Sequence, residues 1–397
     1  MSIQVQVVYR NYIPLNSPYS SFWTNPPQGI SFHIPKQKKF LGKLFFLYQR
    51  FGNSFLVNRT VQIAQHFLFR EKPSKNLPDY YFYVGMQPAT LPSRPFFIDI
   101  EHSYALMNFV KGNQEEAKKK IVALLSHPLC AGVVPISIAA ANSLKKFLGQ
   151  DYATIQKKVT VIYPALPLYA ELYKDKIDHS IINKNQESNL FNIIFVGKDA
   201  YRKGLQAVLP AIDRLYHHLK HYHVRLYVVS DTPNELHNNY RNHPAIRFFP
   251  CKYSAYDVIT KFFMPADLFL MPTLADTFGM VYLEALAAGT PVLLTKQFAT
   301  PEIVENEVSG LFLEHPPLSL DTQDIPKERY GKDYLLQANV QEALVKEIVS
   351  KVDYLIKNPQ RLKQYSKNAT CEFLPGGKFS IQTRNRKLQE IFKSNSL

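Results

Sequence analysis

Short apolar runs alternate with amphipathic helical stretches along the first part of the chain. The pattern predicts strands at 4–9, 80–84, 96–100, 133–136 and 159–163, and helices at 39–51, 113–125 and 138–148. Ser137 is a typical N-cap for the last of these helices, and Gly149 is a typical residue at its end. Strands that alternate with helices in this way favour a parallel α/β sheet.

A polar stretch rich in Lys and Asn, residues 174–189, predicts a linker to a second α/β pattern. The second pattern predicts strands at 192–196, 224–229, 245–249, 268–271 and 291–294, and helices at 205–219, 256–263, 280–288, 340–356 and 381–392. Its strands are almost continuously apolar, which is typical of a doubly wound sheet with helices on both faces. The polar, proline-containing segment 315–333 is expected to be a surface excursion.

Length and composition support this picture. A chain of 397 residues is longer than one hydrophobic core usually organises, so two domains are expected. A hydrophobic fraction of 46% with 20% charged residues argues against a disordered or fibrous chain. The three cysteines stand far apart, which favours neither a disulfide framework nor a zinc site and suits a reducing cytoplasm. The N-terminus alternates like a strand rather than a signal peptide, and no apolar run reaches the roughly 18 residues of a membrane span.

The formal net charge of +15 predicts a surface that attracts anions. Residues 36–75 carry many of the basic side chains, interleaved with Leu and Phe, and Glu71 is the one acid among them. This segment has two interpretations: an amphipathic helix packed on a sheet, or a peripheral contact with an anionic membrane surface. The basic residues follow no recognition motif for nucleic acid, so nucleic acid is not expected as a partner.

A candidate anion site follows the first strand of the second pattern. The segment Phe195-Val-Gly-Lys-Asp-Ala-Tyr-Arg-Lys-Gly204 predicts a tight turn between a strand and a helix, at the edge where open α/β sheets bind ligands. Gly197 allows the backbone to approach a ligand closely, and Lys198 and Lys203 can place two ammonium groups on one anion. Taken alone, the same residues also describe an ordinary turn with solvated lysines.

A second segment, residues 273–292, is predicted to reach the same edge. A helix that begins near Gly279 directs its N–H groups towards the edge, and a helix N-terminus is an anion site. Asp276 lies in the loop before this helix and Glu284 lies about a turn into it, so the two carboxylates are expected to flank a bound diphosphate. For an isolated pair, the usual interpretation is that Asp276 is an N-terminal cap and Glu284 a solvated helix residue.

Together these motifs resemble glycosyltransferase family 4, which carries Gly-Arg-(x)4-Lys-Gly after the first strand of its C-terminal domain and Glu-(x)7-Glu around a Ser-Phe-Gly turn. The resemblance extends from about Ser137 to Gly310 and includes the segments 159–164, 266–272, 285–292 and 301–304 in the same order. It implies a GT-B fold of two Rossmann-like, doubly wound parallel-sheet domains that face a cleft. The implied domains are 1–170 for the acceptor and 171–375 for the nucleotide sugar, with a C-terminal helix, 376–397, that packs back on the first domain.

The resemblance also implies roles for individual residues. Lys203 and Lys198 would contact the donor diphosphate, Glu284 the ribose, and Asp276 with the backbone of Phe278 and Gly279 the transferred sugar. The implied donor-binding set is Gly197, Lys198, Lys203, Asp276, Thr277, Phe278, Gly279, Met280 and Glu284. Three departures stand out: Asp276 replaces a glutamate, Lys198 replaces an arginine and cannot make its bidentate fork, and residues 298–300 replace the usual Gly-Gly.

In the N-terminal half, the segment 94–103 is similar to a family strand that ends in a histidine facing the donor sugar. His102 is therefore the third catalytic candidate beside Asp276 and Lys203, although a lone histidine after a strand also suits a structural role. The Gly-rich first loop of many family members is not found after the strand at 4–9. Asp99 and Glu101 fall on one face of a strand, and no metal site is predicted from them.

The implied reaction is a retaining, metal-independent, hexosyltransferase-type transfer from a UDP- or GDP-sugar to an acceptor hydroxyl. The expected acceptor is a glycan or a lipid-linked molecule, in polysaccharide, glycan or glycolipid biosynthesis, and the expected location is cytoplasmic, with peripheral membrane contact through 36–75 as one alternative. No cofactor is expected. Two further alternatives stay open: a nucleotide-sugar epimerase of GT-B fold, and a catalytically weakened nucleotide-sugar-binding protein.

Overall fold

The computed structural model describes residues 2–9, 21–22, 24–34, 77–88, 90–103, 106, 114–182, 190–314 and 338–394. The chain divides into two compact units, which are described separately. Unit 1 is Met1–Pro164 with Gln382–Leu397, and unit 2 is Ala165–Ile381. The boundaries thus fall at 164 rather than the expected 170, and at 382 rather than 376. The basic segment 36–75, the helix expected at 39–51 and the excursion expected at 315–333 lie outside the described residues.

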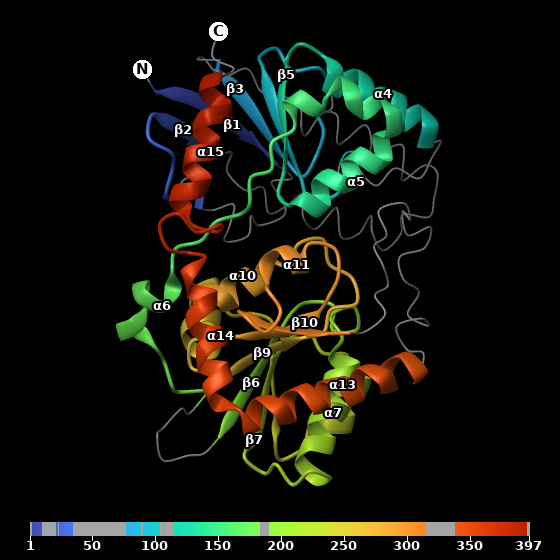
Figure 1. Ribbon diagram of the computed structural model, residues 1–397, viewed down its shortest axis with the longest axis vertical. Helices are drawn as coiled ribbons and strands as arrows, with labels where there is room; N and C mark the ends of the chain where they lie inside the picture. Colours follow the sequence, from blue (N-terminus) through green and yellow to red (C-terminus); the bar gives the residue numbers. More distant parts are fainter. Residues whose placement is uncertain are drawn as a thin grey trace. The chain divides into compact units, whose positions relative to one another are not determined.

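Unit 1 is built on a parallel sheet (Figure 1). Its described strands are β1 (Ile3–Val8), β2 (Ile30–His33), β3 (Tyr80–Val84), β4 (Phe96–Ile100) and β5 (Cys130–Pro135). They lie in the order β2-β1-β3-β4-β5, with every pairing parallel. The short edge strand β2 was not predicted. The strand predicted at 159–163 was wrong: that segment makes an isolated bridge, Val133 with Val159, and no continuous ladder.

Helices cover this sheet. The described helices of unit 1 include α4 (Gln114–Ser126) and α5 (Ile138–Leu148). Ser137 caps α5 as predicted, because its hydroxyl accepts a hydrogen bond from the Ala140 N–H at 2.9 Å, and Gly149 ends the helix. The C-terminal helix α15 (Ile381–Ser394) packs on the sheet, where the Phe392 ring meets the Phe97 ring edge-on at 4.8 Å.

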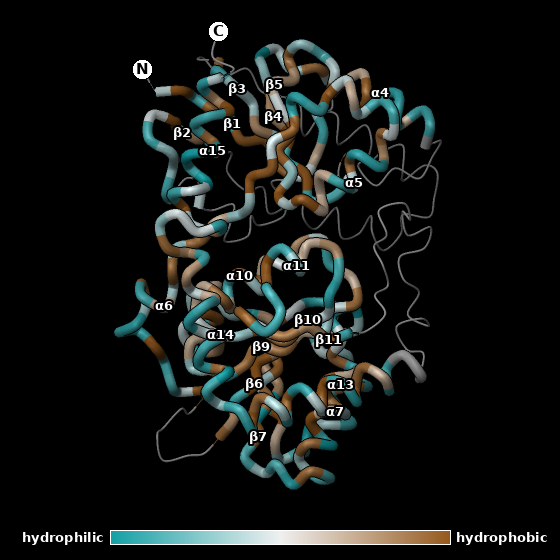
Figure 2. Tube along the Cα trace, viewed as in Figure 1, coloured by the Kyte–Doolittle hydropathy of each residue, from teal (hydrophilic) through white to brown (hydrophobic). Residues whose placement is uncertain are grey.

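Unit 2 contains a six-stranded sheet, also with every pairing parallel. Its strands are β6 (Phe191–Val196), β7 (Val224–Val229), β8 (Ile246–Phe249), β9 (Leu268–Met271), β10 (Val292–Thr295) and β11 (Gly310–Leu313). Starting from β8, the sheet order is third, second, first, fourth, fifth and sixth strand of the unit, which is a doubly wound Rossmann order. All residues of β9, β10 and β11 are buried, and these strands are strongly hydrophobic in Figure 2.

The described helices of unit 2 connect and cover these strands. They include α6 (Tyr169–Leu172), α7 (Leu205–His217), α8 (Asn234–Tyr240), α9 (Ala255–Val258), α10 (Met280–Ala287), α11 (Thr300–Ile303), α13 (Ala338–Lys357) and α14 (Pro359–Cys371). Helix α13 packs on α7, and α10 packs on α14 (Figure 1). Helix α14 begins with Pro359 in its first turn and was not predicted. Among the described helices, none is long and apolar enough to cross a bilayer.

Candidate functional site

The strand order of unit 2 identifies one edge of its sheet as the place for a ligand. Strands β6 and β9 are neighbours, but the chain leaves β6 towards β7 and leaves β9 towards β10, on opposite sides. In open α/β sheets, ligands bind outside the carboxyl ends of the strands at such a switch point. Two loops leave the sheet there, residues 197–204 after β6 and residues 272–279 after β9.

The first loop is held against its neighbours through its two glycines. The Gly197 N–H donates to the Val229 carbonyl at 3.1 Å, and the Ser230 hydroxyl donates to the Gly197 carbonyl at 2.7 Å. Gly204 has a φ of +84°, and a Cβ there would lie 2.2 Å from the Pro272 carbonyl oxygen. Only glycine allows this approach, so the first loop is brought directly against the second.

The second loop ends where α10 begins. Gly279 has a φ of +87°, and a Cβ there would lie 2.4 Å from the Tyr282 ring. The Tyr282 hydroxyl donates to the Met271 carbonyl at 2.7 Å, which fixes the first turn of α10 to the end of β9. Full burial raises the pKa of Tyr282, with a further contribution from the charge of Asp276, so its hydroxyl keeps its proton. The N-terminus of α10 therefore has a defined position at the carboxyl edge.

Arg202 joins the two loops, although the sequence pattern did not single it out. Its carbonyl accepts hydrogen bonds from the Leu274 N–H at 2.8 Å and the Thr273 hydroxyl at 3.4 Å. Its guanidinium donates to the Ala275 carbonyl and forms an ion pair with Asp199 at 2.9 Å. Arg202 thus fixes the residues immediately before Asp276. Its position next to Lys203, inside the motif, was the one signal in the sequence.

An ion pair between a buried lysine and a half-buried aspartate lies at the meeting point of the loops. The Lys203 ammonium donates to the Asp276 carboxylate, and the two side chains are 10% and 15% exposed. An ammonium buried to this degree requires a counter-charge, because an isolated buried charge is strongly unfavourable. The structure therefore brings two of the predicted site residues into direct contact. The Asp276 carboxylate thus takes the place next to the Lys203 ammonium that another anion could take.

The remaining predicted residues of this edge differ in exposure. Lys198 is exposed. Burial raises the pKa of the Cys251 thiol and the charge of Asp231 raises it further, whereas the charge of Lys198 acts to lower it. Phe278 is buried in the second loop, whereas Thr277 and Met280 are half-buried. Glu284 is half-buried on α10, one turn after Met280. The edge thus combines the buried Lys203 ammonium, the exposed Lys198 ammonium, the Arg202 guanidinium and a helix N-terminus.

The third catalytic candidate, His102, lies in unit 1. It lies two residues after the end of β4, is 4% exposed, and has its Nδ1 atom 3.3 Å from the Ser103 hydroxyl. Burial lowers its pKa to about 4, so the ring is neutral at physiological pH. Nearby, the Gly85 N–H donates to the buried Asp99 carboxylate at 2.6 Å, which ties the end of β3 to the end of β4. This contact gives Asp99 a structural role at the carboxyl edge of unit 1.

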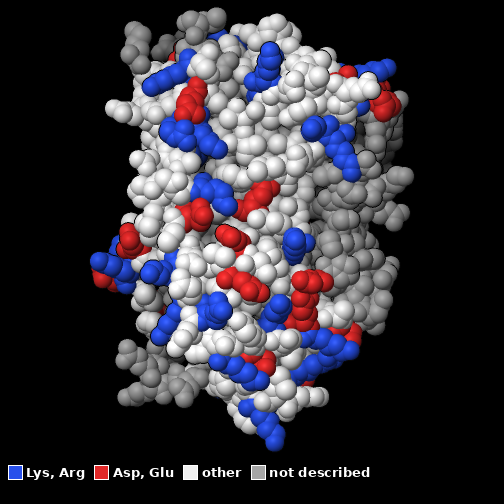
Figure 3. Space-filling model, viewed as in Figure 1, with Lys and Arg blue, Asp and Glu red and all other residues white. Residues whose placement is uncertain are grey.

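A hollow of about 880 Å³ lies at the opposite edge of the unit 2 sheet, lined by the residues that precede or begin β6, β9 and β10, among them Phe191, Asp267 and Pro291. None of the predicted site residues lines it. The end of α13 and the start of α14 also line the hollow, with Lys220 and Lys363 among the lining residues. Figure 3 shows acidic and basic side chains interspersed on one face of the molecule, so overall charge on that face does not mark a site either.

Comparison with solved structures defines the class of fold. HepE from Anabaena, in a complex with UDP and glucose, aligns with 99% of this chain and 100% of its own at a TM-score of 0.61 and 14% sequence identity. With its two Rossmann-like parallel-sheet units, the protein has the GT-B fold of glycosyltransferases. The prediction of the fold class is confirmed.

Sequence comparison places the family on unit 2. Residues 191–321 match the model of the glycosyl transferases group 1 family, which confirms the predicted resemblance. An uncharacterized glycosyltransferase of Methanocaldococcus jannaschii is 28% identical over 185 residues, 44% of this chain and 46% of that protein. A D-inositol 3-phosphate glycosyltransferase of Pseudarthrobacter chlorophenolicus is 23% identical over 212 residues, 51% and 49% of the two chains. These alignments span about half the length of the curated relatives. The residues that match the family model contain both loops of the candidate site.

Proposed function

We propose that the protein is a retaining, hexosyltransferase-type glycosyltransferase, which moves a sugar from a nucleotide diphosphate sugar to an acceptor hydroxyl. The observation that carries this proposal is the buried Lys203 ammonium, paired with Asp276 beside the N-terminus of α10, at the switch point of the sheet. This cation, the glycine turns and the helix terminus all lie within the segment that matches the glycosyltransferase family.

In the proposed donor complex, the diphosphate replaces Asp276 as the partner of Lys203. The α10 N-terminus and the exposed Lys198 complete the anion site. Negative charge builds on the diphosphate as the bond to the sugar breaks, and cations already in position lower that barrier. These groups supply the positive charge at the leaving group, so the proposed reaction requires no divalent metal.

The carboxylate that Lys203 releases then has a second role. We assign Asp276 to a hydroxyl of the transferred sugar, together with the backbone of Phe278 and Gly279, with Thr277 and Met280 beside them. Glu284, one turn into α10, is assigned to the ribose. Asp276 thus exchanges an ion pair for a sugar contact when the donor binds. The Asp276 carboxylate reaches the Lys203 ammonium directly, although its side chain is one methylene shorter than that of a glutamate.

His102 is assigned to orient the sugar or the acceptor. Its pKa of about 4 makes it a neutral hydrogen-bonding group at physiological pH rather than a source of protons. Its assignment predicts that His102→Ala lowers turnover while His102→Gln, which keeps a neutral polar group, retains more of it. Equal losses in both variants would contradict the assignment.

The donor and acceptor follow by analogy. HepE has been crystallised with UDP-glucose, which makes UDP-glucose the first donor to test. The relatives include D-inositol 3-phosphate glycosyltransferases, so small polyol acceptors are tested beside glycans and lipid-linked saccharides. For a lipid-linked acceptor, we propose cytoplasmic action with peripheral membrane contact through residues 36–75. Salt-sensitive flotation with anionic liposomes supports this contact, and its absence contradicts it.

A thermal-shift screen tests the proposed function. UDP-, GDP- and ADP-sugars are compared in magnesium and in EDTA, first with the unaltered protein and then with Lys203→Ala. We expect one donor class to raise the melting temperature equally in both buffers, and Lys203→Ala to lose most of that shift. No shift with any donor, or a shift only in magnesium, contradicts the proposal. Incubation with donor alone separates an epimerase, which alters the sugar, from a transferase, which at most hydrolyses the donor slowly.

A further inference from the structure

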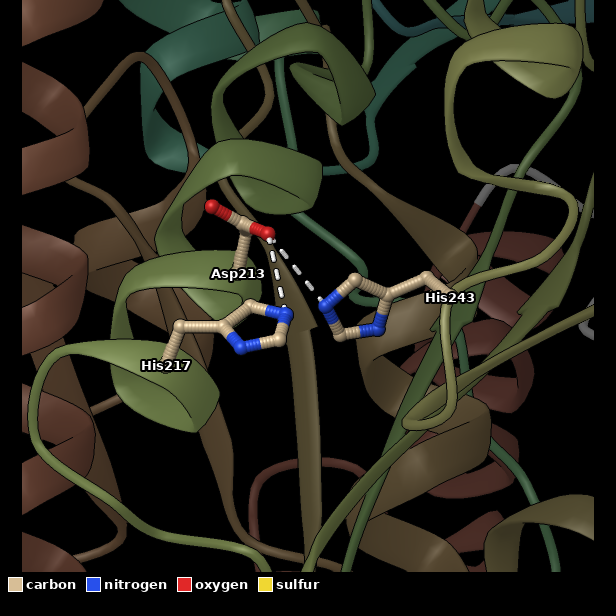
Figure 4. A group of neighbouring side chains, drawn as sticks. All are labelled: Asp213, His217 and His243. Atoms are coloured by element: carbon tan, nitrogen blue, oxygen red, sulfur yellow. Dashed lines mark ion pairs between the residues drawn. The ribbon is translucent and has the colours of Figure 1, made fainter.

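Three side chains that the proposed reaction does not use converge at the amino edge of the unit 2 sheet. Asp213 and His217 lie one turn apart near the end of α7, and His243 lies in the loop before β8 (Figure 4). One ligand atom from each, two histidine nitrogens and a carboxylate oxygen, lies within 4.8 Å of the other two. In the part of the chain that the structure describes, this is the one group of three His, Cys, Asp or Glu side chains that meets this condition.

The distances suit a single metal ion. Asp213 Oδ1 lies 3.4 Å from His243 Nε2 and 3.8 Å from His217 Nε2. Ligand atoms bound to zinc at about 2.0–2.1 Å in tetrahedral geometry lie roughly 3.3 Å apart. The pair of Asp213 and His243 is already at this separation, and His217 is exposed on the last turn of its helix and can move inwards.

His243 is the most enclosed of the three side chains. Its side chain is 7% exposed, and its buried Nε2 atom faces the Asp213 carboxylate in an ion pair of 3.4 Å, which is longer than an ordinary hydrogen bond. A metal ion held by both atoms would give this nitrogen a closer partner. The Tyr216 ring, whose centroid lies 5.0 Å from that of His217 and 5.4 Å from that of His243, limits the space around both imidazoles.

We propose that Asp213, His217 and His243 form a site for a divalent transition metal, with zinc as the best-fitting ion. Two imidazoles and one carboxylate are a borderline-soft donor set that suits Zn²⁺ and Co²⁺, whereas Mg²⁺ and Ca²⁺ prefer oxygen ligands. The fourth position is left to water. Because α7 begins at the donor loop and Asp213 comes eight residues after Leu205, about 12 Å along the helix, the metal site is separate from the donor site.

Binding at this site involves one local rearrangement. The Ala245 N–H donates to His243 Nδ1 at 3.1 Å, so the neutral ring carries its proton on Nε2. A metal on Nε2 moves this proton to Nδ1, and the Ala245 hydrogen bond opens. The bound metal then joins the end of α7 to the entry of β8, so the chemical consequence is a cross-link within unit 2 rather than a catalytic step.

Cobalt is the probe for the test, because Co²⁺ bound by two imidazoles and a carboxylate absorbs visible light whereas aqueous Co²⁺ absorbs very weakly. The full chain, treated with EDTA and dialysed, is titrated with Co²⁺, and Zn²⁺ is then added. We expect one equivalent of Co²⁺ to produce the visible band and Zn²⁺ to abolish it. Absence of a saturable one-equivalent band overturns the proposal.

Variants assign the ligands. His217→Ala and Asp213→Asn alter side chains at or near the surface and are expected to raise the Kd for Co²⁺ at least about tenfold, since even residues that only support a metal ligand have effects of this size. His218→Ala removes an exposed neighbouring histidine and is the matched control, with no change expected. The proposal fails if His217→Ala and Asp213→Asn bind Co²⁺ normally, or if His218→Ala weakens binding equally. Lys203→Ala retains the band, which keeps this test independent of the proposed function.

Discussion

The two units share a parallel, helix-covered architecture but carry different charged groups at the carboxyl edges of their sheets. In unit 2, a buried ammonium and carboxylate meet between two glycine turns beside a helix N-terminus. In unit 1, the corresponding edge holds the neutral ring of His102 and an Asp99 carboxylate that is bonded to the backbone of Gly85. The proposed exchange of partners with an anion therefore belongs to unit 2, whereas unit 1 offers a neutral imidazole and a carboxylate that is already bonded to the backbone.

The largest expected effect comes from removing the cation of unit 2. We expect Lys203→Ala to lower turnover about 100- to 1000-fold, the size seen when one preorganised donor to a developing negative charge is lost. The measurement is the steady-state rate with a nucleotide sugar that stabilises the protein, and circular dichroism verifies the fold. Lys198→Ala is the matched control, since its exposed side chain is expected to have a smaller effect. A Lys203→Ala protein with normal turnover would show that the edge has no role in leaving-group stabilisation.

The contact between the loops can be broken without touching a charge. Gly204→Ala combines a positive φ with a Cβ that would lie 2.2 Å from the Pro272 carbonyl oxygen, and we expect it to lower the free energy of unfolding of unit 2 by about 3 kcal/mol or more. Gly376→Ala is the matched control, because Gly376 has a φ of +92° but no atom within 4 Å of the new Cβ. There we expect about 1–2 kcal/mol from the backbone conformation alone. Equal losses in urea denaturation would mean that the close approach of the loops contributes nothing.

The neutral His102 ring of unit 1 makes the stability of the protein depend on pH. The pKa of His102 in the folded protein, about 4, is below its ordinary value of 6.5, so the unfolded chain binds more protons between these pH values. Stability conferred by the neutral ring is therefore fully present above about pH 6.5 and is lost as the pH falls towards 4. We expect the melting temperature to fall over this window, and His102→Gln to flatten that part of the profile. A parallel fall in both proteins would assign the effect to other groups.

The role of Asp276 as the counter-charge of Lys203 predicts effects of opposite sign. Asp276→Asn leaves the buried ammonium without its partner, so thermal stability should fall in the absence of ligand. UDP no longer has to displace a carboxylate, and we expect its affinity to rise about tenfold, or about 1.4 kcal/mol. Calorimetric titration with UDP, which lacks the sugar, isolates this effect from the proposed sugar contact. Unchanged or weaker UDP binding would contradict the exchange.

Local sequence patterns predicted much of the fold because they reflect burial. The strands at 224–229 and 268–271 have the predicted bounds, since each is largely apolar and, apart from the half-buried Arg225, buried. The pattern missed β2, an edge strand of four residues, and α14, because Pro359 reads as a break although it is tolerated in a first turn. The segment 159–163 has the composition of a strand but lacks a continuous partner.

Some parts of the candidate site could be predicted from the sequence and others could not. The glycine turns and the start of α10 could be predicted, because turn and helix-start signals lie within a few residues of one another. The contact of Lys203 with Asp276 spans 73 residues, as does the bond from Arg202 to Ala275, and such contacts depend on which strands are neighbours. Asp213 and His243 are likewise brought together only by the fold. A local pattern carries no information about such distances.

The smallest expected effect concerns an ion pair that resembles the one at the site but lies on the surface of unit 2. Arg214 on α7 and Glu342 on α13 form two hydrogen bonds of 2.9 and 2.6 Å, yet their side chains are 35% and 43% exposed. The hydrogen bonds between them raise the pKa of Arg214 and lower the pKa of Glu342, which favours the charged form of both. Water nevertheless screens the attraction between the two charges. We expect Arg214→Ala and Glu342→Ala each to change the melting temperature by less than about 3 °C. The double variant Arg214→Ala with Glu342→Ala measures the coupling energy between the two side chains. A coupling energy above about 1 kcal/mol would show that an exposed pair is as strong as a buried one, so burial would not explain the properties of the Lys203 and Asp276 pair.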